Sequence, residues 1–475
     1  MSLPREQFSS KLGFILAAAG SAVGIGNLVG FPVAATKNGG GAFLLIYALF
    51  VFFICLPVML AEMSLGRHTT KDPLGAYNKV SNNHKGWGFA GFLSVLTPFM
   101  IGVFYLVVTV WIFGYLYKTV TGDLSQLAQP GTFGEFVNSS SLFIYMVVVV
   151  AVIYSILVMG VKKGIESAAK LLMPALFIML IGLVIYVLTL DNAFAGVSYY
   201  IVPDFNKITA ATVNGALSQA FFSLSLGMGI LITYGSYLSK RDDIVGGAKM
   251  VAITDTAVAF TAGLLILPAI FSFNPNTNTA ELSDSSVSLM FVFLPKIFLA
   301  LQASLGYVGA SAVAATFFLL VFFAAITSLV SIIEVTVASL IDEKGMSRKQ
   351  ALGFLGGTMG VLAVICTLSF GMVTMFTEFT SYAGASKSVF DVVVDIFYDT
   401  ILPLNGLLVC MFVMRRWKKK QFHAELSEGN DSYEGSWLQK YVDFSLSTFI
   451  PVVLAAVFIN IVAQKYFGIS LLDLI

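Results

Sequence analysis

The sequence predicts an all-α integral membrane protein with about eleven transmembrane helices, built as a five-plus-five inverted repeat whose first and sixth helices are broken. Its 475 residues are 57% apolar and 11% charged, and the mean hydropathy is +0.88. This composition is typical of chains that place much of their surface in lipid. The other two observations are a series of apolar runs of spanning length and a pair of interruptions within two of those runs.

Apolar runs of roughly 20 residues, long enough to cross a bilayer core, define the helices. Their centres lie near residues 23, 55, 105, 150, 178, 225, 260, 322, 360, 403 and 455. We expect spans one to five, about residues 11–189, to form one repeat and spans six to ten, about residues 211–418, to form its inverted partner. The eleventh span, about residues 443–469, lies outside this scheme, and the whole chain, 1–475, is expected to form a single domain.

The first span carries helix-weakening residues at its centre. Gly20, Gly24 and Gly26 each cost a helix about 1 kcal/mol relative to alanine, and Asn27 follows them. Close packing of two helices would explain the glycines but not the asparagine. The sixth span repeats the feature between residues 219 and 229. Two interrupted helices in corresponding positions of two halves indicate a binding site near the middle of the membrane.

The basic residues predict the orientation of the chain. With a cytoplasmic N-terminus, 21 of the 27 Lys and Arg residues fall in inner segments and 6 in outer segments, as the positive-inside rule requires. We therefore expect a multi-pass protein of the cell's inner (plasma) membrane whose C-terminus lies outside. The basic cluster at 415–420 follows a span directly and favours contact with phospholipid over nucleic acid. The outer connection 274–302 is expected to be a loop with a helix over the outer face, serving as a lid.

Ionisable groups inside spans are costly and mark functional sites by default. Glu62, Asp255, Glu334 and Asp391 qualify by position. We expect Glu62 and Glu334 to accept hydrogen bonds from backbone N–H groups that are freed where a helix unwinds. Asp255 has no basic residue nearby, so it must be protonated, paired or bound to a cation.

Oxygen donors recur near the same depth. The eighth span carries Thr327 and Ser328, whose hydroxyls, taken alone, would bond to carbonyl groups of their own helix. Carbonyls at the first interruption, the amide of Asn27, the hydroxyl of Ser223 and the carboxylate of Asp255 add further hard ligands. Because no cluster of His or Cys residues offers a transition-metal site, the set favours a hard cation.

Motifs spread over nearly the whole chain carry a family resemblance. They are Arg5, Gly20–Asn27, Phe31–Pro32, Asn38–Phe43, Glu62, Gly66–Arg67, Gly164–Glu166, Met173–Pro174, Pro203–Phe205, Phe221–Gly227 and Thr327–Ser328. In this order they resemble the neurotransmitter:sodium symporters, and the bacterial members in particular. The resemblance implies a sodium-coupled symporter that takes up a small amino acid or amino acid-like solute by alternating access.

The resemblance also implies two sodium sites. Besides the substrate carboxylate, the ligands of the first would be the carbonyl of Ala22 and the side chains of Asn27, Ser223 and Asp255. The ligands of the second would be the carbonyls of Gly20, Val23 and Ala324 and the hydroxyls of Thr327 and Ser328. The solute carboxylate would complete the ligand shell of the first sodium ion. Solute and sodium would then each bind more tightly when the other is present, which couples their transport.

The solute is expected to bind between the two interruptions. Its carboxylate would lie on the helix N-terminus at Gly24 and Gly26 and accept a hydrogen bond from Tyr105. Its amino group would meet carbonyls around Phe222, Ser223 and Ser225. The residues expected to surround its side chain and complete the pocket are Ala22, Ile25, Ile101, Met228, Ser328 and Ile332.

Two gates follow from the family pattern, with one departure. An inner gate would pair Arg5 with Asp342, supported by Ser236 and Tyr237. At the outer gate the family usually carries an arginine where this chain has Gly30. The carboxylate partner of that arginine falls near residues 394–395, so we do not expect a salt-bridged outer gate.

Chloride-dependent members of the family hold an anion beside the first sodium site, partly through a serine. That serine position is Ala259 here, and Asp255 stands at an asparagine position one turn earlier, although the anion positions Tyr47, Gln219 and Ser223 are kept. A fixed carboxylate repels chloride, because two unit charges ~5 Å apart at an effective dielectric of ~20 interact by ~3 kcal/mol. We therefore expect a transporter that needs sodium but not chloride, with a protonated, structural Asp255 as the alternative.

Other classes of protein stay open. They are a membrane channel or a solute receptor on the same scaffold, and a symporter for a solute that is not an amino acid. A channel would line a continuous polar pore, whereas the polar atoms here converge at one depth. An enzyme is disfavoured, because His68, His84 and His423 lie in predicted inner loops and no nucleophile with a base stands near the midplane.

Overall fold

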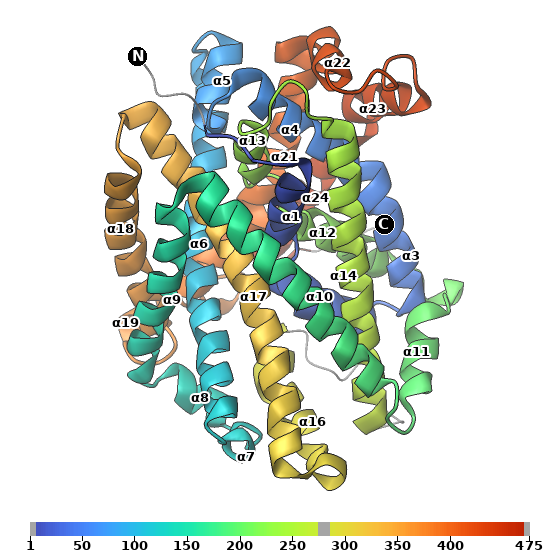
Figure 1. Ribbon diagram of the computed structural model, residues 1–475, viewed down its shortest axis with the longest axis vertical. Coiled ribbons are helices and arrows are strands. Elements are labelled where there is room, and N and C mark those ends of the chain that lie inside the picture. The colour runs from blue at the N-terminus through green and yellow to red at the C-terminus, as the bar shows by residue number, and fades with distance from the viewer. Residues whose placement is uncertain (1–5, 274–285, 470–475) are drawn as a thin grey trace.

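Helices make up most of the computed structural model, which describes residues 6–273 and 286–469, without the side chains of residues 210, 211 and 286 (Figure 1). The first half contains α1 Lys11–Ala22, η1 Gly26–Gly30, α2 Phe31–Lys37, α3 Gly41–Phe50, η2 Val51–Cys55, α4 Leu56–Thr69, α5 Pro73–Ser81, α6 Lys85–Val120, α7 Leu124–Leu127, α8 Thr132–Val137, α9 Ser141–Val158, η3 Val161–Glu166, α10 Ser167–Val187, α11 Ala193–Ile201 and η4 Phe205–Lys207. The second half contains α12 Ala210–Ser223, α13 Ile230–Gly235, α14 Ile244–Phe273, α15 Ser286–Ser288, η6 Leu289–Phe293, α16 Leu294–Ala300, α17 Gln302–Lys344, α18 Arg348–Leu368, α19 Thr374–Thr377, α20 Val389–Val393, η7 Val394–Ile401, α21 Leu402–Met411, η8 Phe412–Lys418, α22 Lys419–Ser427, α23 Trp437–Ser447 and α24 Phe449–Phe467. The one sheet in the described residues is an antiparallel hairpin, β1 Thr380–Tyr382 and β2 Ala385–Lys387, which is a small exception to the all-α prediction.

The spans agree with those expected. Nine described helices are long and apolar enough to cross a membrane, and α1 with η1 and α2 forms a tenth span that is bent by 54°. The sixth predicted span is the pair α12 and α13, separated by residues 224–229, and neither helix is long enough to cross alone. The prediction of about eleven spans with the first and sixth broken is confirmed.

Local sequence explains where several of these helices begin. Ser10 caps α1 by accepting a hydrogen bond from the Gly13 amide, and Pro32 stands in the first turn of α2, where its missing N–H costs nothing. Thr209 and Thr212 form a reciprocal cap at the start of α12. Three of the four segments, α1, α2 and α12, therefore have start signals of their own, whereas α13 begins after Gly229 without a side-chain cap.

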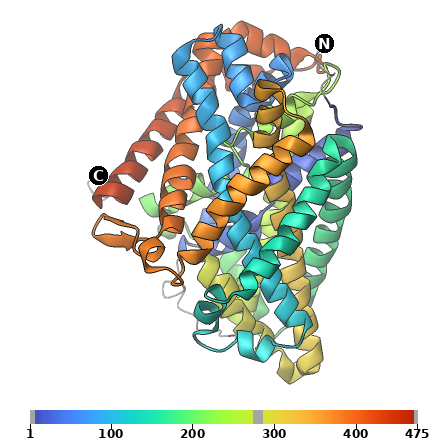
Figure 2. The same ribbon diagram turned by 90° about the vertical axis from the view of Figure 1, so that its left-hand side faces the viewer.

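The first span lies inside the bundle. α1 packs against α10, α14 and α17, and α17 runs along α6 (Figures 1 and 2). Small side chains allow this close approach: a Cβ added at Gly20 would lie 3.3 Å from both Met173 Sδ on α10 and Thr327 Cβ on α17. The broken part of α1 is thus surrounded by the helices that carry the predicted ligands.

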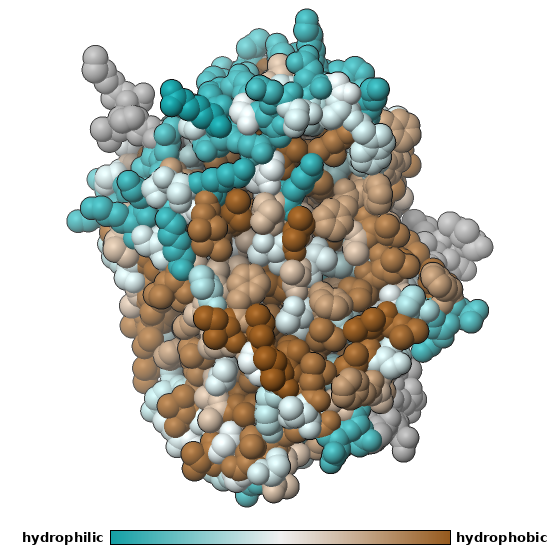
Figure 3. All heavy atoms as spheres, turned by 45° about the vertical axis from the view of Figure 1, so that its right-hand side comes forward, coloured by the Kyte–Doolittle hydropathy of each residue, from teal (hydrophilic) through white to brown (hydrophobic). Residues whose placement is uncertain are grey.

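One end of the molecule is polar. We call it the N-terminal end, because it carries residues 6–10 together with α5, α22 and α23 (Figure 1). Hydrophilic residues gather on this end, and hydrophobic residues form a broad band below it (Figure 3). Such a band with a polar cap is the surface that a bilayer requires of a spanning protein.

The expected outer helix is present at the opposite end. Residues 274–285 of that connection lie outside the described part of the chain, and α15, η6 and α16 form the helical part at residues 286–300. Phe291 is buried there against the rings of Trp111, Tyr115 and Phe133. This helix is therefore packed into the end of the bundle, and its use as a lid stays a prediction.

Candidate functional site

The first break leaves backbone groups free for side chains and ligands. Between α1 and η1 the chain abandons helical hydrogen bonding, and two of the released amides find side-chain partners. The Gly24 amide donates to Asn27 Oδ1 at 3.2 Å, and the Ile25 amide donates to the Tyr105 hydroxyl at 3.2 Å. Asn27 and Tyr105 therefore hold the break in shape.

The second break is shaped by residues with positive φ angles. Ser225, Gly227 and Gly229 have φ of 54°, 76° and 67°, a region that glycine adopts without strain. Glu62 Oε1 accepts from the Gly227 amide at 2.7 Å, and Asn405 Nδ2 donates to the Gly227 carbonyl at 2.9 Å. The expectation that Glu62 accepts a freed backbone N–H is confirmed.

Hydroxyl groups connect the two breaks to α17. The Ser21 carbonyl accepts from Ser225 Oγ at 3.1 Å and from Ser328 Oγ at 3.1 Å. Ser328 Oγ also lies 3.4 Å from the Gly20 carbonyl and 3.3 Å from the Val23 carbonyl. One serine hydroxyl thus faces three carbonyl oxygens of the first break.

Thr327 lies beside this serine. Its hydroxyl donates within its own helix, to the carbonyls of Phe323 at 3.1 Å and Ala324 at 3.0 Å. Such internal bonding is what a membrane threonine does when it has no ligand. Its Cβ lies near Gly20, so a rotation about χ1 would turn its hydroxyl toward the first break. We call Gly20, Val23, Ala324, Thr327 and Ser328 the Ser328 cluster.

A second group of polar atoms surrounds Asp255 on α14. Its carboxylate accepts hydrogen bonds from Asn27 Nδ2 at 2.7 Å, Ser223 Oγ at 2.8 Å and Tyr47 Oη at 3.1 Å. All four side chains are buried. We call them the Asp255 cluster. Ala22 is buried too, but its carbonyl accepts no side-chain hydrogen bond among the described residues.

The two clusters are built almost entirely of neutral oxygens. Among the described residues, no group of three or more His, Cys, Asp or Glu side chains could hold a metal ion. Carbonyl, hydroxyl and amide oxygens with one carboxylate suit a hard monovalent or divalent cation and disfavour transition metals.

Two glycines at the first break have different surroundings. A Cβ added at Gly24 would lie 2.7 Å from Tyr105 Oη and 2.8 Å from Ser328 Oγ, whereas a Cβ added at Gly26 would meet nothing within 4 Å. The Gly26 carbonyl accepts from Gln219 Nε2 at 3.0 Å. Gly26 therefore borders open space at the start of η1.

Apolar residues are predicted to surround the solute side chain. The predicted side-chain contacts Ile101, Met228 and Ile332 are buried, and Ile25 is half-buried. Phe222 stacks on Tyr398 of η7 with ring centroids 4.4 Å apart, and Phe104 meets Tyr398 edge-on at 5.8 Å. The sequence analysis missed Tyr398, although it lies one helical turn after Val394, the position of the family's outer gate.

Comparison with known proteins identifies the family. A family model described as the sodium:neurotransmitter symporter family matches residues 5–130 and 134–469. The chain belongs to the sodium:neurotransmitter symporter family. It is 33% identical over 463 residues to the uncharacterized sodium-dependent transporter YhdH of Bacillus subtilis (strain 168), covering 96% of this chain and 97% of that protein. The fold and the family expected from the motifs are both confirmed.

Two further proteins are similar to this symporter. It is 26% identical over 433 residues to the sodium- and chloride-dependent GABA transporter 2 of Rattus norvegicus, covering 81% of this chain and 70% of the relative. The crystal structure of MhsT in complex with L-phenylalanine matches it with a TM-score of 0.82 and 38% identity, covering 96% of this chain and 99% of MhsT.

Residues that precede α1 make contacts at the N-terminal end of the symporter. The Phe8 ring packs edge-on against Tyr234 and Tyr237, and its amide donates to the Tyr237 carbonyl at 3.3 Å. Ser9 donates twice to the carboxylate of Glu166 at the end of η3. This segment therefore ties the two broken spans to η3 on that side.

The predicted inner gate is only partly within the described residues. Arg5 lies outside them. Asp342 Oδ2 accepts from the Asp72 amide at 2.9 Å, and Ser236 Oγ donates to the Thr233 carbonyl. Tyr237 Oη donates to Glu334 Oε1 at 2.7 Å. The gate assignment itself stays a prediction.

Glu334 differs from the expectation. Its partners are the Tyr237 hydroxyl and the guanidinium of Arg348, so the prediction that it accepts from freed backbone amides is wrong. The reason is its depth: Glu334 lies on α17 close enough to the N-terminal end for Arg348, at the start of α18, to reach it. A buried carboxylate with a paired cation needs no unwound helix.

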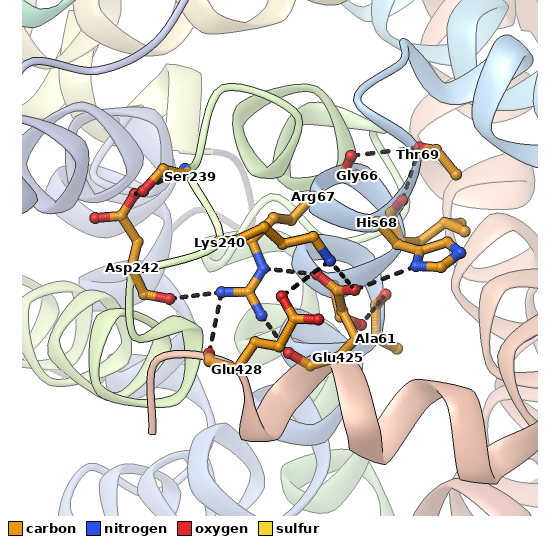
Figure 4. A network of polar contacts seen from close by, with 12 residues as sticks. Ala61, Gly66, Arg67, His68, Thr69, Ser239, Lys240, Asp242, Glu425 and Glu428 are labelled. Atoms are coloured by element: carbon orange, nitrogen blue, oxygen red, sulfur yellow. Dashed lines mark hydrogen bonds and ion pairs between the residues drawn. The ribbon is translucent and has the colours of Figure 1, made fainter. Parts of the chain in front are cut away.

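A further ion network joins α4, the segment after α13 and α22 (Figure 4). Arg67 Nε donates to Glu425 Oε1 at 2.7 Å, while Lys240 Nζ and His68 Nδ1 lie 2.7 and 3.2 Å from Glu425 Oε2. Both Arg67 and Glu425 are buried. Burial alone would raise the pKa of Glu425, but the bonds from His68, Lys240 and Arg67 lower it to about 2.

At the opposite end, Asp395 does not face Gly30. Its carboxylate is paired with Lys465 of α24 at 2.7 Å and with Lys387 of β2 at 3.1 Å. Tyr382 donates to it at 2.7 Å. Since these partners hold Asp395 toward the hairpin, they support the expectation that this symporter lacks the family's salt-bridged outer gate.

Proposed function

We propose that this symporter couples the inward movement of sodium to uptake of an amino acid or amino acid-like solute by alternating access. One observation carries the proposal: the Asp255 and Ser328 clusters meet the same break in α1, and the open space at Gly26 adjoins that break. Ligands that stabilise the same arrangement of one backbone segment favour each other's binding.

Two sodium ions are proposed. In the Ser328 cluster, the carbonyls of Gly20 and Val23 at the first break, the carbonyl of Ala324 on α17 and the hydroxyls of Thr327 and Ser328 would hold one ion. In the Asp255 cluster, hydrogen bonds from neutral groups now stabilise the carboxylate, and the other ion would take their place. Asn27 presents its amide nitrogen to Asp255 and its oxygen to Gly24, so its side chain has to turn over to coordinate sodium.

The proposed solute is an amino acid with an apolar side chain. The helix N-terminus at residues 24–26 and the Tyr105 hydroxyl would take its carboxylate, and carbonyls around Phe222, Ser223 and Ser225 would take its amino group. Isoleucine and methionine side chains and the stacked rings of Phe222 and Tyr398 offer the remainder an apolar surface. That MhsT was crystallised with L-phenylalanine agrees with this class.

Transport is proposed to be independent of chloride. Tyr47 and Ser223, two of the three anion positions kept from chloride-dependent relatives, donate to the Asp255 carboxylate, and the third, Gln219, donates to the Gly26 carbonyl. Ala259, one turn after Asp255, offers no donor. The carboxylate thus occupies the donors that chloride would need and supplies the negative charge itself.

The orientation and organisation are proposed as follows. The N-terminal end faces the cytoplasm and the inner membrane of the cell holds the protein, because most basic residues lie in the inner segments. The end of α24 would then lie on the outer side. Residues 11–189 and 211–418 form inverted repeats, with the helix within 443–469 added. Arg5 and Asp342 form the inner gate, which closes the N-terminal end when the outer side is open.

The competing functions are a channel or receptor on this scaffold and a symporter for a solute other than an amino acid. Direct binding of a panel of standard amino acids, amines and organic acids to the purified protein, with sodium or potassium, discriminates among them. The proposal expects an apolar amino acid to bind in sodium at least tenfold more tightly than in potassium. Binding that ignores the cation would point to a receptor, and binding of amines or organic acids alone would point to another solute.

A further inference from the structure

Outside the transport site, the structure contains a groove between α22 and α23 at the N-terminal end. Its volume is about 630 Å³. The residues that line it are Lys419, Lys420, His423, Ala424, Ser427, Glu434, Gln439, Lys440 and Asp443. None of them takes part in the two oxygen clusters.

One face of α22 lines this groove. Lys420, His423 and Ser427 recur at the helical spacing of three and four residues, while the opposite face carries Glu425 into the ion network of Figure 4. Across the groove, α23 contributes Lys440. Neither Lys420 nor Lys440 forms an ion pair with another described residue, so two ammonium groups are free to bind an anion.

A buried histidine stands at the base of the groove. His423 is 9% exposed, and its Nδ1 lies 2.9 Å from the Tyr433 hydroxyl. Its Nε2 lies 3.6 Å from Asp443 Oδ1, an ion-pair contact when the imidazole is protonated, and neither atom has a hydrogen-bond partner among the described residues. Asp443 is already paired with Lys419 at 3.1 Å through its other oxygen. The Nε2 edge of His423 is therefore not committed to a hydrogen bond within the described residues, and it can donate to a ligand in the groove.

The outer face of α23 is aromatic and exposed. Trp437 and Phe444 are 68% and 59% exposed, and Tyr441 stacks on Trp437 with ring centroids 5.2 Å apart. These three residues recur at intervals of four and three, so they form one stripe. The Phe444 ring also contacts Phe449 at the start of α24, with ring centroids 6.1 Å apart. Tryptophan and tyrosine at the border of an apolar band are typical of the membrane interface.

We propose that this groove binds the phosphate headgroup of an anionic phospholipid from the adjacent leaflet. Lys420, Lys440 and His423 Nε2 would donate to the phosphate, and the acyl chains would follow the aromatic stripe onto α24. Glu434 and Asp443 oppose the anion, but Asp443 is neutralised by Lys419, and the exposed Arg415 at the end of the preceding helix adds positive charge. The proposal commits to lipid over a soluble anion because a basic groove and an interfacial stripe lie on one helix pair.

The test uses the full-length protein in detergent, titrated with phosphatidylglycerol or phosphatidylcholine, with bound lipid counted by native mass spectrometry. Each lysine near an anionic surface contributes enough for the double variant Lys420→Gln/Lys440→Gln to bind phosphatidylglycerol ~10-fold less tightly. The matched control, Lys344→Gln/Lys349→Gln, removes the same charge from exposed lysines elsewhere at that end and should bind like wild type.

Three results overturn the proposal: equal binding of the two lipids, equal loss in both double variants, or displacement of phosphatidylglycerol by excess inorganic phosphate, which would assign the groove to a free anion. Fluorescence gives an independent readout. Trp437 is the exposed tryptophan among four, so phosphatidylglycerol brominated near its headgroup should quench wild-type emission and quench Trp437→Phe much less. Equal quenching in both proteins would also overturn the proposal.

Discussion

At the scale of single residues, the transport site depends on which atoms of the first break are covered and which are open. Gly24 is covered by the hydroxyls of Tyr105 and Ser328, and Gly26 borders open space. The two positions are two residues apart, yet a methyl group at each would act on different partners. This contrast separates the solute from the ions in experiment.

Gly26→Ala should fold normally, because its methyl group meets nothing, and should weaken solute binding at least ~10-fold by filling the space proposed for the carboxylate. Gly24→Ala should disturb sodium and solute together, since its methyl group would displace Ser328 Oγ. Solute affinity and sodium affinity are measured separately by scintillation proximity binding. Unchanged solute affinity in Gly26→Ala would show that the solute carboxylate does not bind beside Gly26.

The Ser328 cluster is tested by Thr327→Val with Ser328→Ala. The pair keeps most of the volume and removes two hydroxyl ligands, so the concentration of sodium that gives half-maximal uptake should rise at least ~10-fold. Thr336→Val is the matched control, because the Thr336 hydroxyl lies on the same helix, is buried and has no hydrogen-bond partner. A sodium dependence that stays the same in the double variant refutes the assignment.

The role of Asp255 is tested by exchanging chloride for gluconate at constant sodium. Wild-type uptake should be unchanged, because the carboxylate supplies the fixed negative charge. Asp255→Asn with Ala259→Ser removes that charge and adds a donor, so uptake by this double variant should come to depend on chloride. Collapse of wild-type uptake in gluconate would show that the carboxylate does not replace the anion.

At the scale of elements, α22 has two functional faces. Its buried side holds Glu425 against α4 and the end of the sixth span. Its other side lines the groove between α22 and α23, where we propose that lipid binds. Removing one partner of a buried ion pair leaves the other charge without compensation. The stability of this element should therefore depend on pH.

Glu425→Gln should lower the free energy of unfolding by on the order of 3 kcal/mol at pH 7. The folded-state pKa, about 2, lies below the ordinary value of 4.5. The stabilisation is therefore fully present above pH 4.5 and is lost as the pH falls toward 2. Thermal unfolding of wild type and variant should converge over that window.

The exposed neighbour Glu428, which also contacts Lys240, provides the control. Glu428→Gln should change the melting temperature little at any pH, since exposed ion pairs contribute only ~0–1 kcal/mol. A gap between wild type and Glu425→Gln that does not narrow in acid would mean that the network is held together by packing alone.

At the scale of the whole molecule, sequence predicted the spans, both breaks and the family, because apolar length, helix-weakening residues and ordered motifs are local properties. It also placed Asn27, Ser223 and Asp255 in one cluster, since the family pattern fixes their depth. It could not find the Glu334–Arg348 pair, the Lys465–Asp395 pair or the Tyr398 stack. These contacts join residues whose proximity depends on how neighbouring helices pack, and no periodicity encodes that.

The central claim is that the clusters at the break couple sodium to solute. The most direct measurement is uptake of radiolabelled apolar amino acids into proteoliposomes under an inward sodium gradient, with potassium in its place as the control. Accumulation above the external concentration with sodium, abolished by a sodium ionophore, is the predicted result. Entry that stops at the external concentration, or that is the same in potassium, would contradict coupled symport and leave a channel on this scaffold.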